Sequence, residues 1–333
     1  MWAQGLTWSR RNQILMIMRI HYQLALLTLL TLAGCTDSPS RPKGNVIAVS
    51  IHPVADIVRQ IVGDTVEVET IIPPGKSPHG FSMTAKTLTK VRQARVLVVV
   101  GRGLDRVVEK AATDVGGDGM ELLSVADLVT GSDGHDGHDH HEHAKECEDN
   151  HEHHGHDHSG PNPHMWLDPV LARKFVIELT EHLSEAFPEH ASVFAANSET
   201  IAGELQVIHE EYEKGLGGIE QKHMITFHDS FDLLAERYGL EVVAHLSPVE
   251  LRPGGEITLK RRREVIELIE KHKLTTIYFE PQFPQGETQW FKDKGARILQ
   301  LDPLGNPNAD GYKTFQQMMR TNLGTLIQGQ SGK

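Results

Sequence analysis

The chain has little of what marks several protein classes. Its 333 residues include only two cysteines, which excludes a small domain held together by disulfides. No apolar run reaches the roughly 20 residues that a membrane-spanning helix needs, which excludes a polytopic membrane protein. Acidic residues outnumber basic ones, 45 to 33, and the formal net charge is −12. This argues against a nucleic-acid binder, which needs a basic face. At roughly 150 residues per domain, the length predicts two domains.

Histidine, in contrast, is abundant. The chain has 21 histidines, and histidine is the commonest metal ligand among side chains. Ten of them lie in residues 131–160, a segment of Gly, His, Asp and Glu with no apolar period. Such a composition cannot build a core, so we expect an exposed loop that binds zinc weakly at several alternative sets of ligands. The candidate ligands of this loop are His135, His138, His140, His141, His143, His151, His153, His154, His156 and His158.

The first residues predict export. Three arginines precede an apolar run at residues 24–33, and the run ends at Gly34-Cys35. A basic start, a short apolar stretch and a small-residue stop indicate a signal peptide over residues 1–34, because the run is too short for an anchor. Leu32-Ala-Gly-Cys35 resembles the bacterial lipobox, which implies lipidation of Cys35 and a polar tether over residues 35–44. We expect a lipid-anchored protein that faces the periplasm or the cell exterior.

Short apolar runs alternate with helical periods through the rest of the chain. We predict strands at residues 46–51, 66–72, 96–100, 121–125, 224–227, 241–245, 275–279 and 297–301. A helix over 168–187 and a long polar helix over 189–215 separate the two series, and a last helix begins near residue 311. Strands that alternate with helices indicate parallel sheets covered on both faces. The predicted fold is α/β, with lobes at 45–187 and 219–333 joined by a long rigid helix within 188–218.

Four potential metal ligands follow predicted strands. His79 and His164 come after the second and fourth strands, His228 ends Ile225-Thr-Phe-His228, and Asp302 ends the last strand. Open parallel sheets bind ligands at the carboxyl ends of their strands, so we expect these side chains to meet between the lobes. Three imidazoles and a carboxylate suit Zn²⁺ in a closed site, and they also admit Mn²⁺, Fe²⁺ or Cu²⁺.

Three other potential ligands also lie at the ends of predicted strands. His52, His245 and Glu280 also end predicted strands, and we expect mainly structural roles for them, such as helix starts or hydrogen bonds to ligands. Glu280 is the nearest rival to Asp302 as the fourth ligand, and His52 ends the first strand, close to the expected site.

Several short motifs together resemble one protein family. They are Ser77-Pro-His79, Asn162-Pro-His-Met-Trp-Leu-Asp-Pro169, Ile225-Thr-Phe-His-Asp-Ser-Phe231, Phe279-Glu-Pro-Gln-Phe283 and Leu301-Asp-Pro-Leu-Gly305. The set is similar to the metal receptors (cluster A-I) among solute-binding proteins of ABC transporters, especially the zinc type. The resemblance implies two Rossmann-like lobes with one metal held between them by His79, His164 and His228, and with Asp302 at the carboxylate position. Manganese and iron receptors usually have a carboxylate in place of His228, so its imidazole favours zinc.

The resemblance implies a receptor that delivers Zn²⁺ to a membrane permease. We expect a monomer and, from the acidic net charge, no nucleic acid among its partners. A manganese or iron receptor of the same family is an alternative. A zinc hydrolase, with water as the fourth ligand, is a weaker one, because the chain has no His-Glu-x-x-His helix. A surface adhesin is the third. Because we favour the receptor over the hydrolase, we predict that the protein is not an enzyme.

Overall fold

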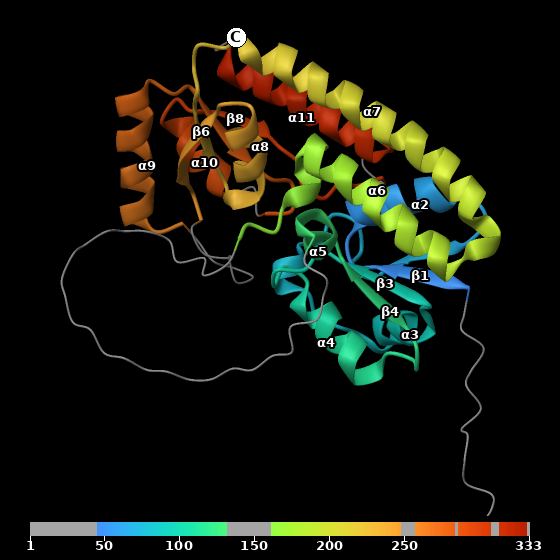
Figure 1. Ribbon diagram of the computed structural model, residues 1–333. Helices are drawn as coiled ribbons and strands as arrows, with labels where there is room; N and C mark the ends of the chain where they lie inside the picture. Colours follow the sequence, from blue (N-terminus) through green and yellow to red (C-terminus); the bar gives the residue numbers. More distant parts are fainter. Residues whose placement is uncertain (1–44, 132–160, 248–256, 284–285, 308–312, 332–333) are drawn as a thin grey trace, which may run out of the picture. The chain divides into compact units, whose positions relative to one another are not determined.

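The computed structural model of the chain describes residues 45–131, 161–247, 257–283, 286–307 and 313–331 (Figure 1). All of these belong to one compact unit, residues 43–333. The expected signal peptide, the tether with Cys35 and the ten clustered histidines lie outside the described residues. None of the described helices is long and apolar enough to cross a membrane.

The first lobe is built on a four-stranded parallel sheet. Its strands are β1 (Val46–Val49), β2 (Glu67–Thr70), β3 (Val96–Val99) and β4 (Glu121–Ser124), in the order β2-β1-β3-β4. Its helices are α2 (His52–Val62), α3 (Ala85–Gln93), α4 (Arg106–Val115) and α5 (Val125–Thr130). The central strands β1 and β3 are almost completely buried, as continuous apolar runs predict for strands covered on both faces.

The second lobe repeats this arrangement. Its strands are β5 (His223–Thr226), β6 (Glu241–His245), β7 (Thr276–Phe279) and β8 (Arg297–Gln300), in the order β6-β5-β7-β8. Its helices are α8 (Asp232–Arg237), α9 (Leu259–His272), α10 (Gly286–Asp293) and α11 (Phe315–Gln330). In both lobes the second strand pairs on the outer side of the first, so the strand order reverses between the two central strands. Such a reversal opens a crevice at the carboxyl ends of the strands.

Two consecutive helices separate the sheets in the sequence. They are α6 (Pro169–Ala186) and the 27-residue α7 (Ala191–Gly217). The carboxylate of Asp168 caps α6 by accepting hydrogen bonds from the backbone N–H groups of Val170 (2.9 Å) and Leu171 (3.3 Å). Helix α7 packs against α6, α2 and α11 (Figure 1). The buried Tyr212 hydroxyl of α7 donates to the backbone oxygen of Met319 in α11 at 2.7 Å.

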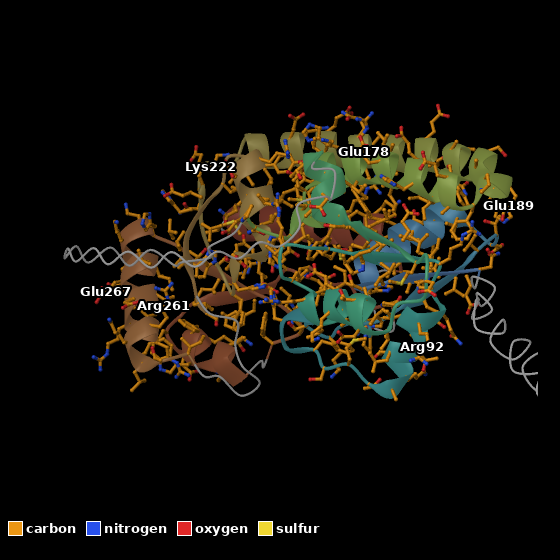
Figure 2. The ribbon with its side chains drawn as sticks, turned by 60° about the horizontal axis from the view of Figure 1, so that its bottom comes forward. Arg92, Glu178, Glu189, Lys222, Arg261 and Glu267 are labelled. Atoms are coloured by element: carbon orange, nitrogen blue, oxygen red, sulfur yellow. The ribbon has the colours of Figure 1, made fainter. Side chains whose placement is uncertain are left out.

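The apolar core crosses from one lobe to the other. One cluster of buried side chains includes the first sheet, α6 and α7, and it continues into the second lobe through residues such as Tyr278 and Met318. A smaller cluster, which includes Phe227, Phe279 and Phe291, fills the other side of the second sheet. Charged side chains such as Glu189 and Glu267 are exposed to solvent at opposite ends of the view in Figure 2. Because the lobes share a core along α7 and α11, we expect small relative movements rather than wide hinge opening.

The predicted α/β fold with two parallel sheets is confirmed, and each predicted strand is present within two residues of its expected ends. The helix expected from residue 189 begins at Ala191, because Pro188–His190 forms a separate 3-10 turn. The last helix begins at Phe315, where the Thr314 side chain caps it, rather than near residue 311. Helix α5 was not predicted. The boundaries of the lobes stay predictions.

Candidate metal centre

His79 lies in a single 3-10 turn, Pro78–Gly80, that follows β2. Pro78 occupies the first position of this turn, where its fixed φ angle suits the geometry, and its side chain is buried. The turn therefore places the His79 imidazole beyond the carboxyl end of β2 while leaving it partly exposed.

His164 lies directly before the 3-10 turn Met165–Leu167 and is only 3% exposed. The side-chain oxygen of Asn162 accepts a hydrogen bond from the His164 backbone N–H and lies 2.9 Å from its Nδ1. An amide oxygen can only accept, so Nδ1 carries the proton and Nε2 is left as the ligand atom. The ring also packs against Trp166, with 5.2 Å between centroids, and the Trp166 indole donates to the backbone oxygen of Pro303 at 2.7 Å.

His228 follows β5 and precedes the 3-10 turn Asp229–Phe231. Its Nδ1 lies 2.5 Å from a carboxylate oxygen of Glu280, which follows β7. The Ser230 hydroxyl donates to the same Glu280 oxygen at 3.1 Å. A carboxylate that receives Nδ1–H fixes the tautomer of a ligating histidine, so His228 also presents Nε2 as its ligand atom.

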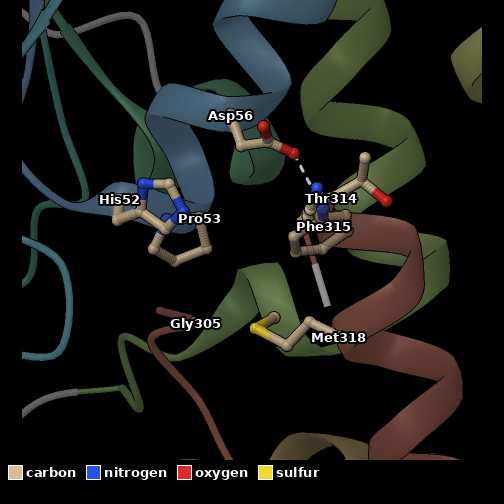
Figure 3. Close-up of a pocket in the computed structure, with 8 residues that line it drawn as sticks. His52, Pro53, Asp56, Gly305, Thr314, Phe315 and Met318 are labelled. Carbon is tan, nitrogen blue, oxygen red and sulfur yellow. Dashed lines mark hydrogen bonds between the residues drawn. The ribbon is translucent and has the colours of Figure 1, made fainter. Parts of the chain in front are cut away.

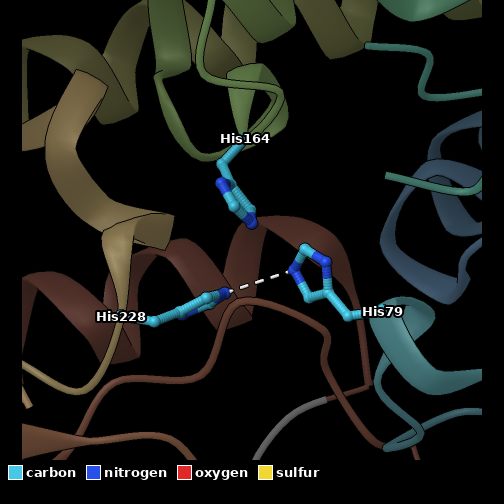
Figure 4. A group of neighbouring side chains, drawn as sticks. All are labelled: His79, His164 and His228. Carbon is cyan, nitrogen blue, oxygen red and sulfur yellow. Dashed lines mark hydrogen bonds between the residues drawn. The ribbon is translucent and has the colours of Figure 1, made fainter. Parts of the chain in front are cut away.

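The three imidazoles converge from separate elements (Figure 4). One nitrogen from each of His79, His164 and His228 lies within 4.8 Å of the others, the only such group of three or more potential ligands among the described residues. The two Nε2 atoms of His79 and His228 are 3.4 Å apart. Tetrahedral Zn–N bonds of about 2.0–2.1 Å place neighbouring nitrogens about 3.3 Å apart, so this separation fits a zinc ion.

The electrostatics of the centre are set by Glu280, which is 1% exposed. Burial lowers the pKa of His228, but the negative charge and hydrogen bond of Glu280 act against it, and Asp229 and Asp232 add to the opposing effect. The pKa of His228 is raised as a result. Gln282 donates to the second oxygen of Glu280 and helps to hold the buried carboxylate in place. A cation at Nε2 of His228 therefore has a negative charge directly behind the ring.

Asp302, the predicted fourth ligand, lies in the turn after β8, outside the group of three histidines. One of its oxygens accepts hydrogen bonds from the backbone N–H groups of Leu304 (3.0 Å) and Gly305 (2.9 Å). Burial raises the pKa of Asp302, those two hydrogen bonds oppose the shift, and the charge of Glu280 adds to it. The two acids therefore interact, and the identity of the fourth ligand stays a prediction.

Two other predicted candidates lie outside the histidine group. His52 begins α2 and lines a small pocket with Asp56, Gly305 and Phe315 (Figure 3). Burial lowers the pKa of His52, although Asp56 opposes the shift. His245 lies 3.2 Å from the Asp232 carboxylate and 2.9 Å from the Thr226 hydroxyl. Glu280, the third alternative candidate, contacts Nδ1 of His228. This contact is a hydrogen bond to a ligand, which is one of the structural roles expected for these candidates.

The role of Asn162 was not anticipated, although it belongs to one of the motifs. The signal was its position, two residues before His164, from which an Asn side chain can accept a hydrogen bond from the backbone N–H two residues further on. Periodicity does not detect such a contact. Ser230 was missed for the same reason.

Comparisons with known proteins find relatives that match most of the chain. The profile of a family described as "ZnuA: Zinc-uptake complex component A periplasmic" matches residues 47–329. The zinc-binding lipoprotein AdcA of Streptococcus pneumoniae is 29% identical over 315 residues, which cover 93% of this chain. The alignment spans only 60% of that relative's length. The high-affinity zinc uptake system protein ZnuA of Yersinia pestis is 28% identical over 289 residues, which cover 81% of this chain and 87% of the relative.

Solved structures show the same fold. The Zn(II)-bound ZnuA-like domain of Streptococcus pneumoniae AdcA matches with a TM-score of 0.68 and 26% identity, covering 86% of this chain and 98% of that domain. A zinc-bound ZnuA deletion mutant matches with a TM-score of 0.69 and 22% identity, covering 87% of this chain and 99% of the other.

Proposed function

Because this chain belongs to the ZnuA family of zinc-uptake components, matched over residues 47–329, we propose that it is a zinc receptor for an ABC transporter. It captures Zn²⁺ between its lobes and delivers the ion to a membrane permease. Zinc is the cargo in this proposal, so the protein performs no chemical reaction on it.

The convergence of three histidine nitrogens carries this proposal. His79 and His164 come from the first lobe and His228 comes from the second, and their ligand atoms lie within 4.8 Å of one another. Zinc accepts imidazole ligands readily and imposes no geometric preference from its d electrons. A site divided between two lobes also couples occupancy to their relative position, which a receptor needs because it must release its cargo at the permease.

Charge supports a divalent cation at this position. Three neutral imidazoles leave both charges of Zn²⁺ uncompensated, and a buried charge needs a partner. Glu280 supplies one negative charge behind His228. Asp229 supplies another, since one of its oxygens lies 3.9 Å from both Nδ1 of His164 and Nε2 of His228. Protons compete for the same nitrogens, so zinc uptake requires neutral histidines.

For the fourth ligand we favour Asp302 or water over Glu280. Glu280 is engaged by Nδ1 of His228, by Ser230 and by Gln282. Asp302 receives both of its backbone hydrogen bonds at one oxygen. Coordination of the metal by its second oxygen would close the coordination shell, as in sites without catalytic water. An open fourth position would favour a hydrolase, and turnover of an ester or peptide would reveal it.

The proposal includes the parts of the chain that the structure does not describe. We propose that residues 1–34 direct export, that Cys35 carries the lipid anchor on the outer side of the membrane, and that the ten histidines between His135 and His158 bind additional zinc weakly. The lobes would span 45–187 and 219–333, with the connecting helix within 188–218. The permease is the expected partner, and the receptor would act as a monomer.

Competitive metal titration tests the proposed function. The chain lacking residues 131–160 is titrated with Zn²⁺ against Mn²⁺, Fe²⁺ and Cu²⁺, beside its His228→Ala variant. The control is His182→Ala, because His182 also lies near a carboxylate, 3.3 Å from Glu121, but on the surface and outside the histidine group. We expect one tight zinc equivalent that His228→Ala abolishes and His182→Ala retains. Absence of a tight equivalent in the parent chain would refute the proposal, and preference for Mn²⁺ would favour the manganese alternative.

A further inference from the structure

Asn162 makes contacts on both sides of the metal centre. Its side-chain oxygen faces the first lobe and accepts from the backbone N–H of His164, and it lies 2.9 Å from Nδ1 of that ring. Its side-chain nitrogen donates to the backbone oxygen of Asp229 at 2.8 Å. Asp229 directly follows His228 in the second lobe. One amide group therefore connects the two ligand-bearing turns.

The chemistry of the amide fixes which end faces which lobe. The backbone oxygen of Asp229 can only accept, so the NH₂ end of Asn162 must face it. The carbonyl end then faces His164 and can only accept, so the proton of that ring lies on Nδ1. The hydrogen bond to the second lobe and the tautomer of the ligand in the first lobe are thus set by the same group.

The backbone around Asn162 is held by a separate set of contacts. The Arg102 guanidinium donates to the backbone oxygen of Asn162 at 3.1 Å. Arg102 has φ of +53°, a left-handed conformation that is uncommon for a residue other than glycine. The completely buried Asp105 carboxylate supports this turn by accepting from the backbone N–H groups of Val100 (2.6 Å) and Gly101 (3.1 Å). Several groups of the first lobe therefore fix the position of Asn162.

We propose that Asn162 is a positioning residue that joins the lobes across the metal centre and slows zinc release. This inference rests on the proposed zinc-receptor function and adds a determinant of how long the ion stays bound. While the amide bond to Asp229 is intact, the turns that carry His164 and His228 stay in register. When it breaks, the two turns lose the contact between them that lies closest to the ligands, and the ion loses a ligand more readily.

Asn162→Asp separates the two roles of the amide. A carboxylate keeps an acceptor for Nδ1–H of His164, and carboxylate partners make ligating histidines more basic. If orienting His164 were the whole role, the variant would therefore release zinc no faster, or more slowly, than the parent. The same change puts an oxygen against the backbone oxygen of Asp229, so the bond between the lobes is replaced by repulsion. The proposal thus predicts faster release from a chain that carries one more negative charge.

The test measures zinc release from the full chain loaded with one equivalent of Zn²⁺ and mixed with an excess of a chelator. We expect Asn162→Asp to release zinc about 10–100 times faster, the range typical for groups that support metal ligands, and to bind it at a nearly unchanged rate. Nitrogen NMR of the His164 ring should still show a proton on Nδ1. Release at the parent rate, or slower, would overturn the proposal.

Asn197→Asp is the matched control. The Asn197 side chain donates to the backbone oxygen of Ile61 at 3.0 Å, a similar amide-to-carbonyl bond between α7 and α2. Its loss should lower the melting temperature without changing zinc release, and faster release in this variant would contradict the assignment to Asn162. If Asn162→Asp does not fold, Asn162→Ala removes the same bond without adding charge; it must release zinc faster while nitrogen NMR still shows the proton on Nδ1 of His164. A parent chain that holds no tight zinc would instead refute the proposed function.

Discussion

Replacing Glu280 by glutamine should weaken zinc binding by about 10–100-fold, which corresponds to about 1.4–2.8 kcal/mol. Glutamine keeps the size of the side chain but removes its charge. The structure makes that charge important, because Glu280 is 1% exposed and lies 2.5 Å from Nδ1 of His228. Two effects act in the same direction. The ring exchanges a charged acceptor for a neutral amide oxygen, which makes its Nε2 less basic, and the bound ion loses a buried counter-charge.

Competition against a fluorescent zinc chelator at a fixed pH above 7 measures the change in affinity. Glu264→Gln is the matched control, since this carboxylate pairs with Arg261 at 3.1 Å on α9 and lies outside the histidine group. It should change zinc affinity less than twofold. A similar small change in Glu280→Gln would refute the role assigned to the buried carboxylate. A loss far above 100-fold, with a lower coordination number in X-ray absorption, would identify Glu280 itself as a zinc ligand.

The remaining predictions concern pH and packing. The pKa of His228 is raised, so zinc affinity should fall with decreasing pH from above about 6.5, the usual histidine value. By the same linkage, protonated His228 stabilises the metal-free chain at low pH, and this stabilisation is lost as pH rises through the raised pKa. Zinc affinity that rises, or a stability contribution that falls, with decreasing pH would contradict this. Within α11, Gly324→Ala should stabilise by about 0.5–1 kcal/mol, because a methyl group there has no atom within 4 Å. Gly329→Ala should destabilise by about 1–3 kcal/mol, because its Cβ would collide with the buried Tyr278 hydroxyl. Tyr212→Phe removes the hydrogen bond to α11 and should lower the free energy of unfolding in denaturant by about 1 kcal/mol. A variant with the same stability as the parent chain would contradict the packing described at that residue.

The fold was predictable because its strands are short, apolar and buried. Runs such as residues 96–100 are too short for a typical helix and rich in valine, which favours a covered strand, and the helices between the runs indicate parallel pairing. Helix α5 was not predictable in the same way, since Val125–Thr130 has only six residues and directly follows β4. A segment of that length contains too few turns to show a helical period.

The convergence of the three histidines followed from one rule, that ligands gather at the carboxyl ends of parallel strands. The same rule selected His52 and Asp302 equally, and it could not distinguish a ligand from a neighbouring side chain. What the sequence left open is the direction of each side chain. Whether Glu280 reaches the metal or Nδ1 of His228 depends on distances of a few ångströms, and these are set by packing between segments far apart in the chain.

The contact between α2 and α11 has a consequence for how the chain folds. The backbone N–H of Phe315 donates to the Asp56 carboxylate at 2.7 Å across 259 residues of sequence, and the Gln316 amide donates to Gln60 at 2.6 Å across 256. Helix α2, near the beginning of the lobe-forming region, also packs against α7, but it gains these two hydrogen bonds only when α11 is present. Loops of this length make such contacts late in folding. A chain interrupted during synthesis, before α11 emerges, would lack the helix whose side chains complete the core shared by both lobes. We expect such a chain to be susceptible to proteolysis until α11 has been added.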